Sequence, residues 1–238
     1  NRINIYGSDG SHMGYWGVSG YKFGELRGPS GIAFDSNDDL FISDHLNNRI
    51  QKFSKDGKPI MSFGNDKLED DSLALPWGLT IASDNCVYVA NWGNHRVNKY
   101  ADDGTLIRTF GSPGTGKGEF RYPSSVAVSD DGYIYVADWG NERVQILDAN
   151  GMVITQLRGE ATISKWGQDF LDANYEEAEP RSRSNLEQDI NLFADNSHEE
   201  SAHIEKFVWG PTSVKLDDAG RLYVTESNRH RVQIYERL

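Results

Sequence analysis

The chain has 238 residues, of which 24 are basic and 36 are acidic, so its formal net charge at pH 7 is −12. Phosphate backbones are bound by clustered Lys and Arg, so this excess of acid argues against a nucleic-acid partner. No apolar stretch approaches the roughly 18 residues of a membrane-spanning helix, and we expect no membrane span. The composition fits a secreted or soluble β domain, and we favour an extracellular or cell-surface location, although the single Cys86 cannot form an internal disulfide that would decide the compartment.

A six-residue pattern returns along the chain at a fixed interval. Residues 48–53 read NRIQKF, residues 95–100 read HRVNKY and residues 142–147 read ERVQIL, and the related NRINIY opens the chain. Arg49, Arg96 and Arg143 therefore lie 47 residues apart. A constant period of this length is typical of repeat architectures, in which one unit of supersecondary structure is copied.

Within each copy, apolar and polar residues alternate with the period of two that β-strands have, and Asp, Asn and Gly separate the runs as hairpin turns require. The expected strands, in chain order, are residues 2–6, 13–16, 31–35, 39–43, 49–53, 59–63, 79–82, 87–90, 96–100, 106–110, 126–128, 133–137, 143–147, 153–157, 213–216, 221–225 and 231–235. We predict an all-β fold in which residues 1–238 form one β-propeller domain of four-stranded antiparallel blades. A blade cannot bury both of its faces alone, so the copies must stack around a central channel.

The predicted strands begin and end in the middle of a blade. The first two are a third and a fourth strand, and the last three are a first, a second and a third strand. Three interpretations stay open. The chain is a piece of a longer protein, a neighbouring molecule supplies the missing strands to form an oligomer or fibre, or the ring is complete but small. An open blade edge presents unpaired backbone groups that favour such self-association.

The repeated unit resembles the NHL repeat. The motifs that carry the resemblance are a Pro before Gly-Ile-Ala-Phe-Asp at 31–35, Ile-Ser-Asp at 42–44, Asn-Arg-Ile-Gln at 48–51, and the pairs Asp-Gly at 56–57 and Phe-Gly at 63–64. The third copy fits best, whereas the second has Asn91 in place of the family's Asp and the last has Glu226. The likeness covers the chain except for residues 160 to 206. It implies a propeller, usually of six blades, but no activity, because one fold hosts many functions.

Residues 160–206 interrupt the period and hold 12 acidic and 4 basic side chains. Ile163, Trp166, Phe170 and Leu171 share one face of a helix, and Leu186, Ile190 and Phe193 share a face of another. We expect two short helices separated by residues 180–184. Propeller topology places this acidic helical insertion between two blades, on the face where the loops joining second to third strands emerge. It either covers core edges or forms a docking surface or partial lid.

The same loop face carries the candidate binding residues. Trp92 and Trp139 occupy one repeat position, which is His45 in the first full copy, while His95 and His230 share another. Aromatic side chains there either stack on a ligand or partner, as in many interaction sites, or pack against the next blade. An acid-and-arginine pair recurs beside them and is expected to tie each loop structurally. Its members are Asp44 with Arg49, Asn91 with Arg96, Asp138 with Arg143, and Glu226 with Arg231.

No catalytic or metal centre is evident. The resemblance includes a peptide-amidating lyase that binds zinc through histidines directly after the Pro of first strands, but these positions are Ser30, Trp77, Ser124 and Thr212 here. Zinc catalysis needs about three protein ligands, so we expect no cofactor. We predict a non-catalytic interaction propeller that binds a protein or glycan through the loop face. The alternatives are a structural subunit that assembles by completing its neighbour's blade, and an extracellular lyase-like or lactonase-like enzyme with a site in the channel.

Overall fold

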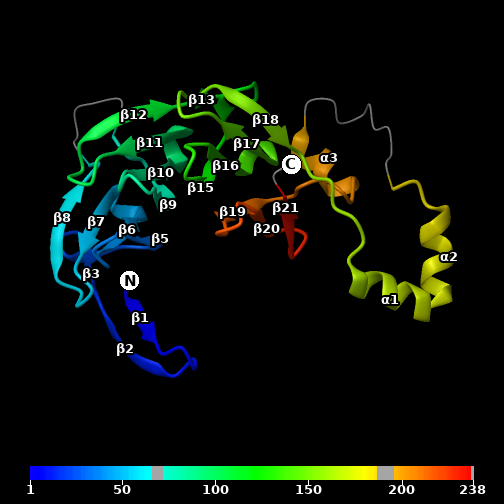
Figure 1. Cartoon of the computed structure of the whole chain (residues 1–238), viewed down its shortest axis with the longest axis horizontal. Coiled ribbons are helices and arrows are strands. Elements are labelled where there is room, and N and C mark those ends of the chain that lie inside the picture. Colours follow the sequence, from blue (N-terminus) through cyan, green and yellow to red (C-terminus); the bar gives the residue numbers. More distant parts are fainter. Residues whose placement is uncertain (66–71, 187–195, 237–238) are drawn as a thin grey trace.

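The computed structural model describes residues 1–65, 72–186 and 196–236. It confirms the propeller fold, because antiparallel sheets follow one another around an arc (Figure 1). A hairpin of β1 (Ile3–Tyr6) and β2 (His12–Trp16) comes first. The four blades after it are blade 1 with β5 (Pro29–Phe34), β6 (Leu40–Asp44), β7 (Arg49–Phe53) and β8 (Pro59–Phe63); blade 2 with β9 (Pro76–Ile81), β10 (Val87–Asn91), β11 (Arg96–Tyr100) and β12 (Leu106–Phe110); blade 3 with β15 (Pro123–Val128), β16 (Ile134–Asp138), β17 (Arg143–Leu147) and β18 (Val153–Leu157); and blade 4 with β19 (Pro211–Leu216), β20 (Leu222–Glu226) and β21 (Arg231–Tyr235).

The strand register repeats from blade to blade. The acid or amide that ends the second strand pairs with the arginine that begins the third, as in Asp44 with Arg49 and Asp138 with Arg143. First strands start at their proline, earlier than the alternation alone predicts, because Pro is tolerated as the first residue of a strand. Two short parallel pairs lie in the links between blades and were not predicted. They are β3 (Val18–Ser19) with β4 (Glu25–Leu26), and β13 (Ser112–Pro113) with β14 (Glu119–Phe120).

The hydrophobic core lies between adjacent blades. Phe41 and Ile50 of blade 1 pack with Leu79 and Val89 of blade 2, and every one of them is at most 3% exposed. Equivalent clusters join blade 2 to blade 3 and blade 3 to blade 4. Blades 2 and 3 therefore bury both of their faces against neighbouring blades, which is why the alternating pattern is apolar on both sides of their central strands.

Glycines allow the first strands of adjacent blades to approach closely. A Cβ added to Gly78 of β9 would lie 2.7 Å from the carbonyl oxygen of Ser124 in β15. Gly31 of β5 meets the carbonyl oxygen of Trp77 in the same way, at 2.5 Å. These contacts set the spacing of the inner strands β5, β9, β15 and β19, which line the concave side of the arc (Figure 1).

The insertion contains helices α1 (Lys165–Ala173), α2 (Tyr175–Arg183) and α3 (Ser197–His203). The sequence predicted a break at Pro180, but α2 runs through it. The φ of proline is compatible with a helix, although its ring removes one hydrogen bond. Acidic Glu176 and Glu177 in the first turn and basic Arg181 and Arg183 in the last turn interact favourably with the helix dipole and stabilise α2.

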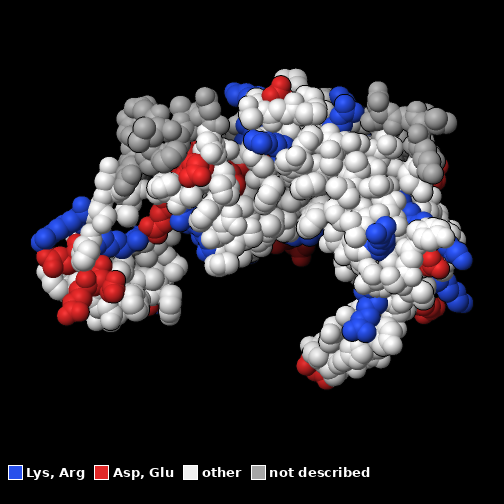
Figure 2. All heavy atoms as spheres, turned by 180° about the vertical axis from the view of Figure 1, so that it is seen from behind, with Lys and Arg blue, Asp and Glu red and all other residues white. Residues whose placement is uncertain are grey.

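The second predicted helix falls mostly outside the described residues, which include neither Ile190 nor Phe193, and Leu186 lies beyond the end of α2. Helices α1 and α2 stand at one end of the arc (Figure 1), and residues of α1 and β21 line the same pocket. Helix α3 contacts the loop between the second and third strands of blade 3. Acidic side chains gather over this end of the molecule (Figure 2). None of the helices in the described residues is long and apolar enough to cross a membrane.

Candidate ligand-binding face

The loops between second and third strands share one backbone design. In blades 1 to 3 the loop begins with a short 3-10 helix, namely η1 (His45–Asn47), η2 (Trp92–Asn94) or η3 (Trp139–Asn141), whereas residues 227–230 of blade 4 form a turn. The residue after each helix, Asn48, His95 or Glu142, has a φ of 53 to 57°. The first helical position therefore holds His45, Trp92 or Trp139 in the same orientation, at corresponding points of three blades.

In blades 1, 3 and 4, a buried carboxylate and an arginine tie the loop to the link that precedes the blade. Asp138 Oδ2 lies 2.8 Å from Nε of Arg143, and Asp44 Oδ2 lies 2.7 Å from Nε of Arg49. Glu226 and Arg231 make the same pair at 2.7 Å. Blade 2 has the neutral Asn91, which instead accepts the N–H of Ala74 and donates to the carbonyl of Ser72.

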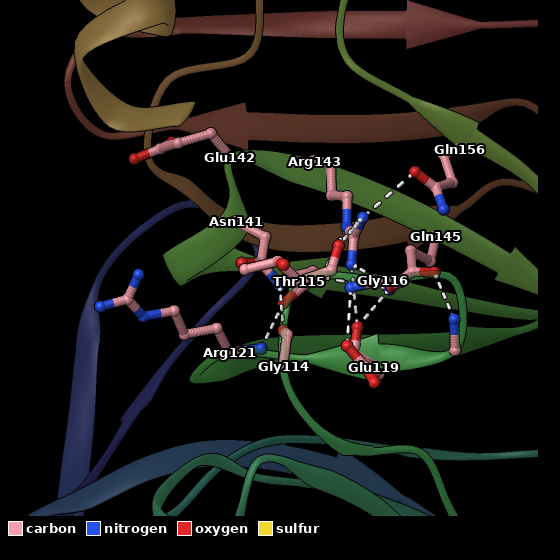
Figure 3. Close-up of polar contacts among 12 residues, drawn as sticks. Gly114, Thr115, Gly116, Glu119, Arg121, Asn141, Glu142, Arg143, Gln145 and Gln156 are labelled. Carbon is pink, nitrogen blue, oxygen red and sulfur yellow. Dashed lines mark hydrogen bonds and ion pairs between the residues drawn. The ribbon is translucent and has the colours of Figure 1, made fainter. Parts of the chain in front are cut away.

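Arg143 shows why this position needs an arginine (Figure 3). Its guanidinium donates to the carbonyls of Thr115, Gly116 and Glu119, at 2.8 to 2.9 Å, in addition to the Asp138 carboxylate. Gln145 donates to the same Glu119 carbonyl. Five donors in a planar fork match this set of acceptors, whereas a lysine would satisfy fewer of them. These arginines are structural, because their donors are used within the fold.

A second contact joins neighbouring blades. The side chain after each 3-10 helix accepts the backbone N–H of the residue that precedes the next blade's first proline. Asn48 Oδ1 accepts from Leu75 at 2.8 Å, His95 Nδ1 accepts from Tyr122 at 2.9 Å, and Glu142 Oε2 accepts from Gly210. We call this contact the inter-blade clamp.

The clamp determines the protonation state of His95. Because a backbone amide can only donate, Nδ1 of His95 must offer its lone pair, and the neutral ring carries its proton on Nε2. Burial lowers the pKa of His95 below its ordinary value of 6.5, the charge of Arg121 lowers it further, and Asp138 acts in the opposite direction. His45 is the opposite tautomer when neutral, since its Nδ1 lies 3.2 Å from the carbonyl of Pro76, which can only accept.

Aromatic rings from three blades form a continuous row on this face. The row runs from His45 to Trp77, Trp92, Tyr122 and Trp139, and the centroids of successive rings are 4.8, 6.4, 4.4 and 6.5 Å apart. Trp77 is 40% exposed and Trp139 is 37% exposed. We call these five side chains the aromatic strip. His95 packs against Tyr122 at 4.3 Å and supports the strip from the side.

The structure therefore brings His45, Trp92, His95 and Trp139 together, through two residues that the sequence analysis missed. Trp77 directly follows the proline of its first strand and Tyr122 directly precedes one. Their position in the sequence could have indicated that they belong to the strip. Each lies beside the proline at which the link ends and the first strand begins, and this point lies on the loop face. His230 is exposed, and no ring contact within the described residues involves it.

Beyond the strip, α3 is anchored at the junction of blades 3 and 4. His198 Nδ1 lies 2.7 Å from Oε1 of Glu142, and Arg158 pairs with Glu200 at 2.6 Å. Burial raises the pKa of the Glu142 carboxyl, while the N–H of Gly210 and the imidazole of His198 oppose this rise. Within the part of the chain that the structure describes, no cluster of three or more His, Cys, Asp or Glu side chains has the arrangement of a metal site.

Fold and loop design together define a β-propeller in which buried acid-and-arginine pairs hold the loops of blades 1, 3 and 4 against the links that precede these blades. The profile of the NHL repeat matches residues 120–147 and 209–235, and the profile described as SMP-30/Gluconolactonase/LRE-like region matches residues 21–117. Blades 3 and 4 thus contain matches to the NHL repeat, and blades 1 and 2 lie in a segment similar to the gluconolactonase-like region, as expected of a β-propeller of this type. No protein of curated function matches it in sequence.

Several solved propellers share the fold at low sequence identity. Virginiamycin B lyase from Staphylococcus aureus, in a catalytically inactive form with quinupristin, is 14% identical with a TM-score of 0.58, and the alignment covers 99% of this chain and 62% of the lyase. A protein of unknown function from Bacteroides thetaiotaomicron is 18% identical with a TM-score of 0.63, covering 98% of this chain and 53% of that protein. The chain thus spans between one half and two thirds of the length of these structures.

Proposed function

We propose that this chain is a non-catalytic binding module that takes a glycan across the aromatic strip. The observation that carries the proposal is the unbroken row of rings contributed by three blades, with Trp77 and Trp139 more than one third exposed. Structural packing alone needs each ring to touch its neighbour, but it does not need indole faces in solvent, where apolar surface is unfavourable.

A glycan fits this strip better than a folded protein does. The strip is one ring wide and curves over three blades, and the C–H faces of successive sugar rings pack against aromatic faces one at a time. A stable protein interface instead requires roughly 1,000 Å² or more of complementary surface around a compact apolar centre.

The test is calorimetric titration of the chain with a panel of neutral and acidic oligosaccharides, comparing the wild type with Trp92→Ala and Trp139→Ala. Truncating a central aromatic anchor should weaken binding by about tenfold or more. The matched control is Trp166→Ala, because Trp166 is 79% exposed on α1 and lies outside the strip.

Three results would contradict the proposal. The first is that no oligosaccharide binds, the second is that Trp166→Ala weakens binding as much as Trp92→Ala, and the third is that the bound saccharide is cleaved. Circular dichroism of each variant separates loss of the ligand site from loss of the fold, and Trp139→Ala provides a strip variant whose ring is already partly exposed.

A further inference from the structure

Arg121 is held at the Trp139 end of the aromatic strip. Its backbone N–H donates to Oδ1 of Asp138 at 2.7 Å, and its carbonyl accepts the N–H of Gly140 at 2.7 Å. The stem of its side chain lies over Gly140, where an added Cβ would be 2.8 Å from Cγ of Arg121. The base of the side chain is therefore fixed beside η3, whose first residue is Trp139.

The guanidinium of Arg121 is available to a ligand. Arg121 is exposed, and none of the ion pairs among residues 1–65, 72–186 and 196–236 involves its side chain. In Figure 3 its guanidinium points away from the network around Arg143 and Glu119, and no contact is drawn to it. The planar fork of an arginine is suited to bind carboxylates in bidentate fashion.

The carboxylates nearest to Arg121 are occupied elsewhere. Asp138 is fully buried and receives hydrogen bonds from the Arg121 backbone, Asn141, Arg143 and Gln145. Glu142 is 2% exposed and accepts from Gly210 and His198. Residues 160–206 hold 12 of the 36 acidic side chains but 4 of the 24 basic ones, and acidic side chains lie beside basic ones over this end of the molecule (Figure 2).

A second donor lies on the other side of Tyr122. The inter-blade clamp occupies Nδ1 of His95 and so leaves a proton on Nε2, which is a donor and not an acceptor. His95 and Arg121 are close enough for the arginine charge to act on the imidazole. The rings of Trp92, Tyr122 and Trp139 are thus accompanied by two groups that donate hydrogen bonds and by no free carboxylate among the described residues.

We propose that the aromatic strip selects an acidic glycan, whose carboxylate is bound by the Arg121 guanidinium with the Nε2–H of His95 as a second donor, while its sugar ring stacks on Tyr122 and Trp139. This inference rests on the glycan-binding function proposed above and adds to it the class of sugar, a uronic acid. A sulfated sugar presents a related anion but not the two coplanar oxygens that match the guanidinium fork.

The experiment compares three probes of similar length: an oligogalacturonate, a neutral cello-oligosaccharide and a sulfated oligosaccharide. Each is titrated into the wild type, Arg121→Gln and Arg121→Lys. The matched control is Arg108→Gln, which removes the same charge from exposed Arg108 of β12, on the outer edge of blade 2. We expect Arg121→Gln to weaken binding of the oligogalacturonate by about tenfold to a hundredfold.

The neutral cello-oligosaccharide should bind the wild type and Arg121→Gln equally. Arg121→Lys should recover part of the lost affinity for the oligogalacturonate. Added salt should weaken the binding of the oligogalacturonate but not that of the neutral probe. Equal affinity of the wild type for the neutral and uronate probes would overturn this inference and leave the glycan function standing. Stronger binding of the sulfated probe would also overturn it, in favour of a sulfate site. Absence of binding by all three probes would remove the glycan function and this inference together.

Discussion

Replacement of His95 by Ala and by Asn measures the inter-blade clamp. The alanine variant loses the hydrogen bond from the Tyr122 N–H and the ring contact with Tyr122, while the β-carbon at a φ of 57° is present in both proteins. The lost hydrogen bond is worth about 1 to 1.5 kcal/mol and the ring contact about 0.5 to 1 kcal/mol. His95→Ala should therefore destabilise the protein by about 2 kcal/mol.

The asparagine variant should lose much less. Asn48 fills the same position in blade 1, has a φ of 54°, and accepts the N–H of Leu75 through its Oδ1. His95→Asn therefore keeps the clamp and tolerates the backbone, and it loses only the ring contact, or about 0.5 to 1 kcal/mol.

The assay is urea unfolding followed by tryptophan fluorescence and circular dichroism, with the free energy of unfolding compared at pH 7.5. Equal destabilisation by the two substitutions would refute the reasoning, because the hydrogen bond from the Tyr122 N–H would then not be the contribution that matters. A neutral effect of His95→Ala would refute it as well.

Three further predictions concern pH, packing and the arginine tie. Since the pKa of His95 is lowered in the folded state, its stabilising contribution is complete above about pH 6.5 and is lost as pH falls through the folded pKa. The wild type should therefore lose its stability advantage over His95→Ala on acidification. His95→Asn should keep its own advantage over His95→Ala, because asparagine does not titrate. Gly78→Ala should lower the free energy of unfolding by about 1 to 3 kcal/mol, because its Cβ would meet the Ser124 carbonyl at 2.7 Å, and an unchanged urea midpoint would contradict the close approach of blades 2 and 3. Arg143→Lys should lower the free energy of unfolding in urea by about 2 to 4 kcal/mol, because the buried Asp138 keeps its charge but loses the contact with Nε. Arg108→Lys, the control at an exposed arginine, should be nearly neutral. Comparable losses in the two variants would argue against the tie.

The periodic spacing of Arg49, Arg96 and Arg143 was sufficient to predict the blades and their strand order, since a strand's faces can be read from alternation. The positions of Trp92, Trp139 and His45 at one point of the repeat could be predicted in the same way. The distances between these rings in neighbouring blades could not be predicted, because they depend on how closely Gly31 and Gly78 allow the first strands to approach one another.

The helical insertion was predicted less well. Amphipathic spacing indicated α1, but α2 continues through Pro180, where the sequence predicted a break. Nothing in local spacing indicated that His198 of α3 would reach Glu142, which is 56 residues earlier in the chain.

By itself, the sequence determined the repeat, the blade and the identity of the residues that share a face, because strand periodicity and turn chemistry are local properties. Only the tertiary structure decided which of these residues meet. Trp77 and Tyr122 complete the aromatic strip, and His95 accepts a hydrogen bond from the Tyr122 N–H at the start of the next blade. Arg121 is left without an ion pair among the described residues. These are contacts between residues of different blades, and they depend on the angle and distance at which neighbouring sheets pack.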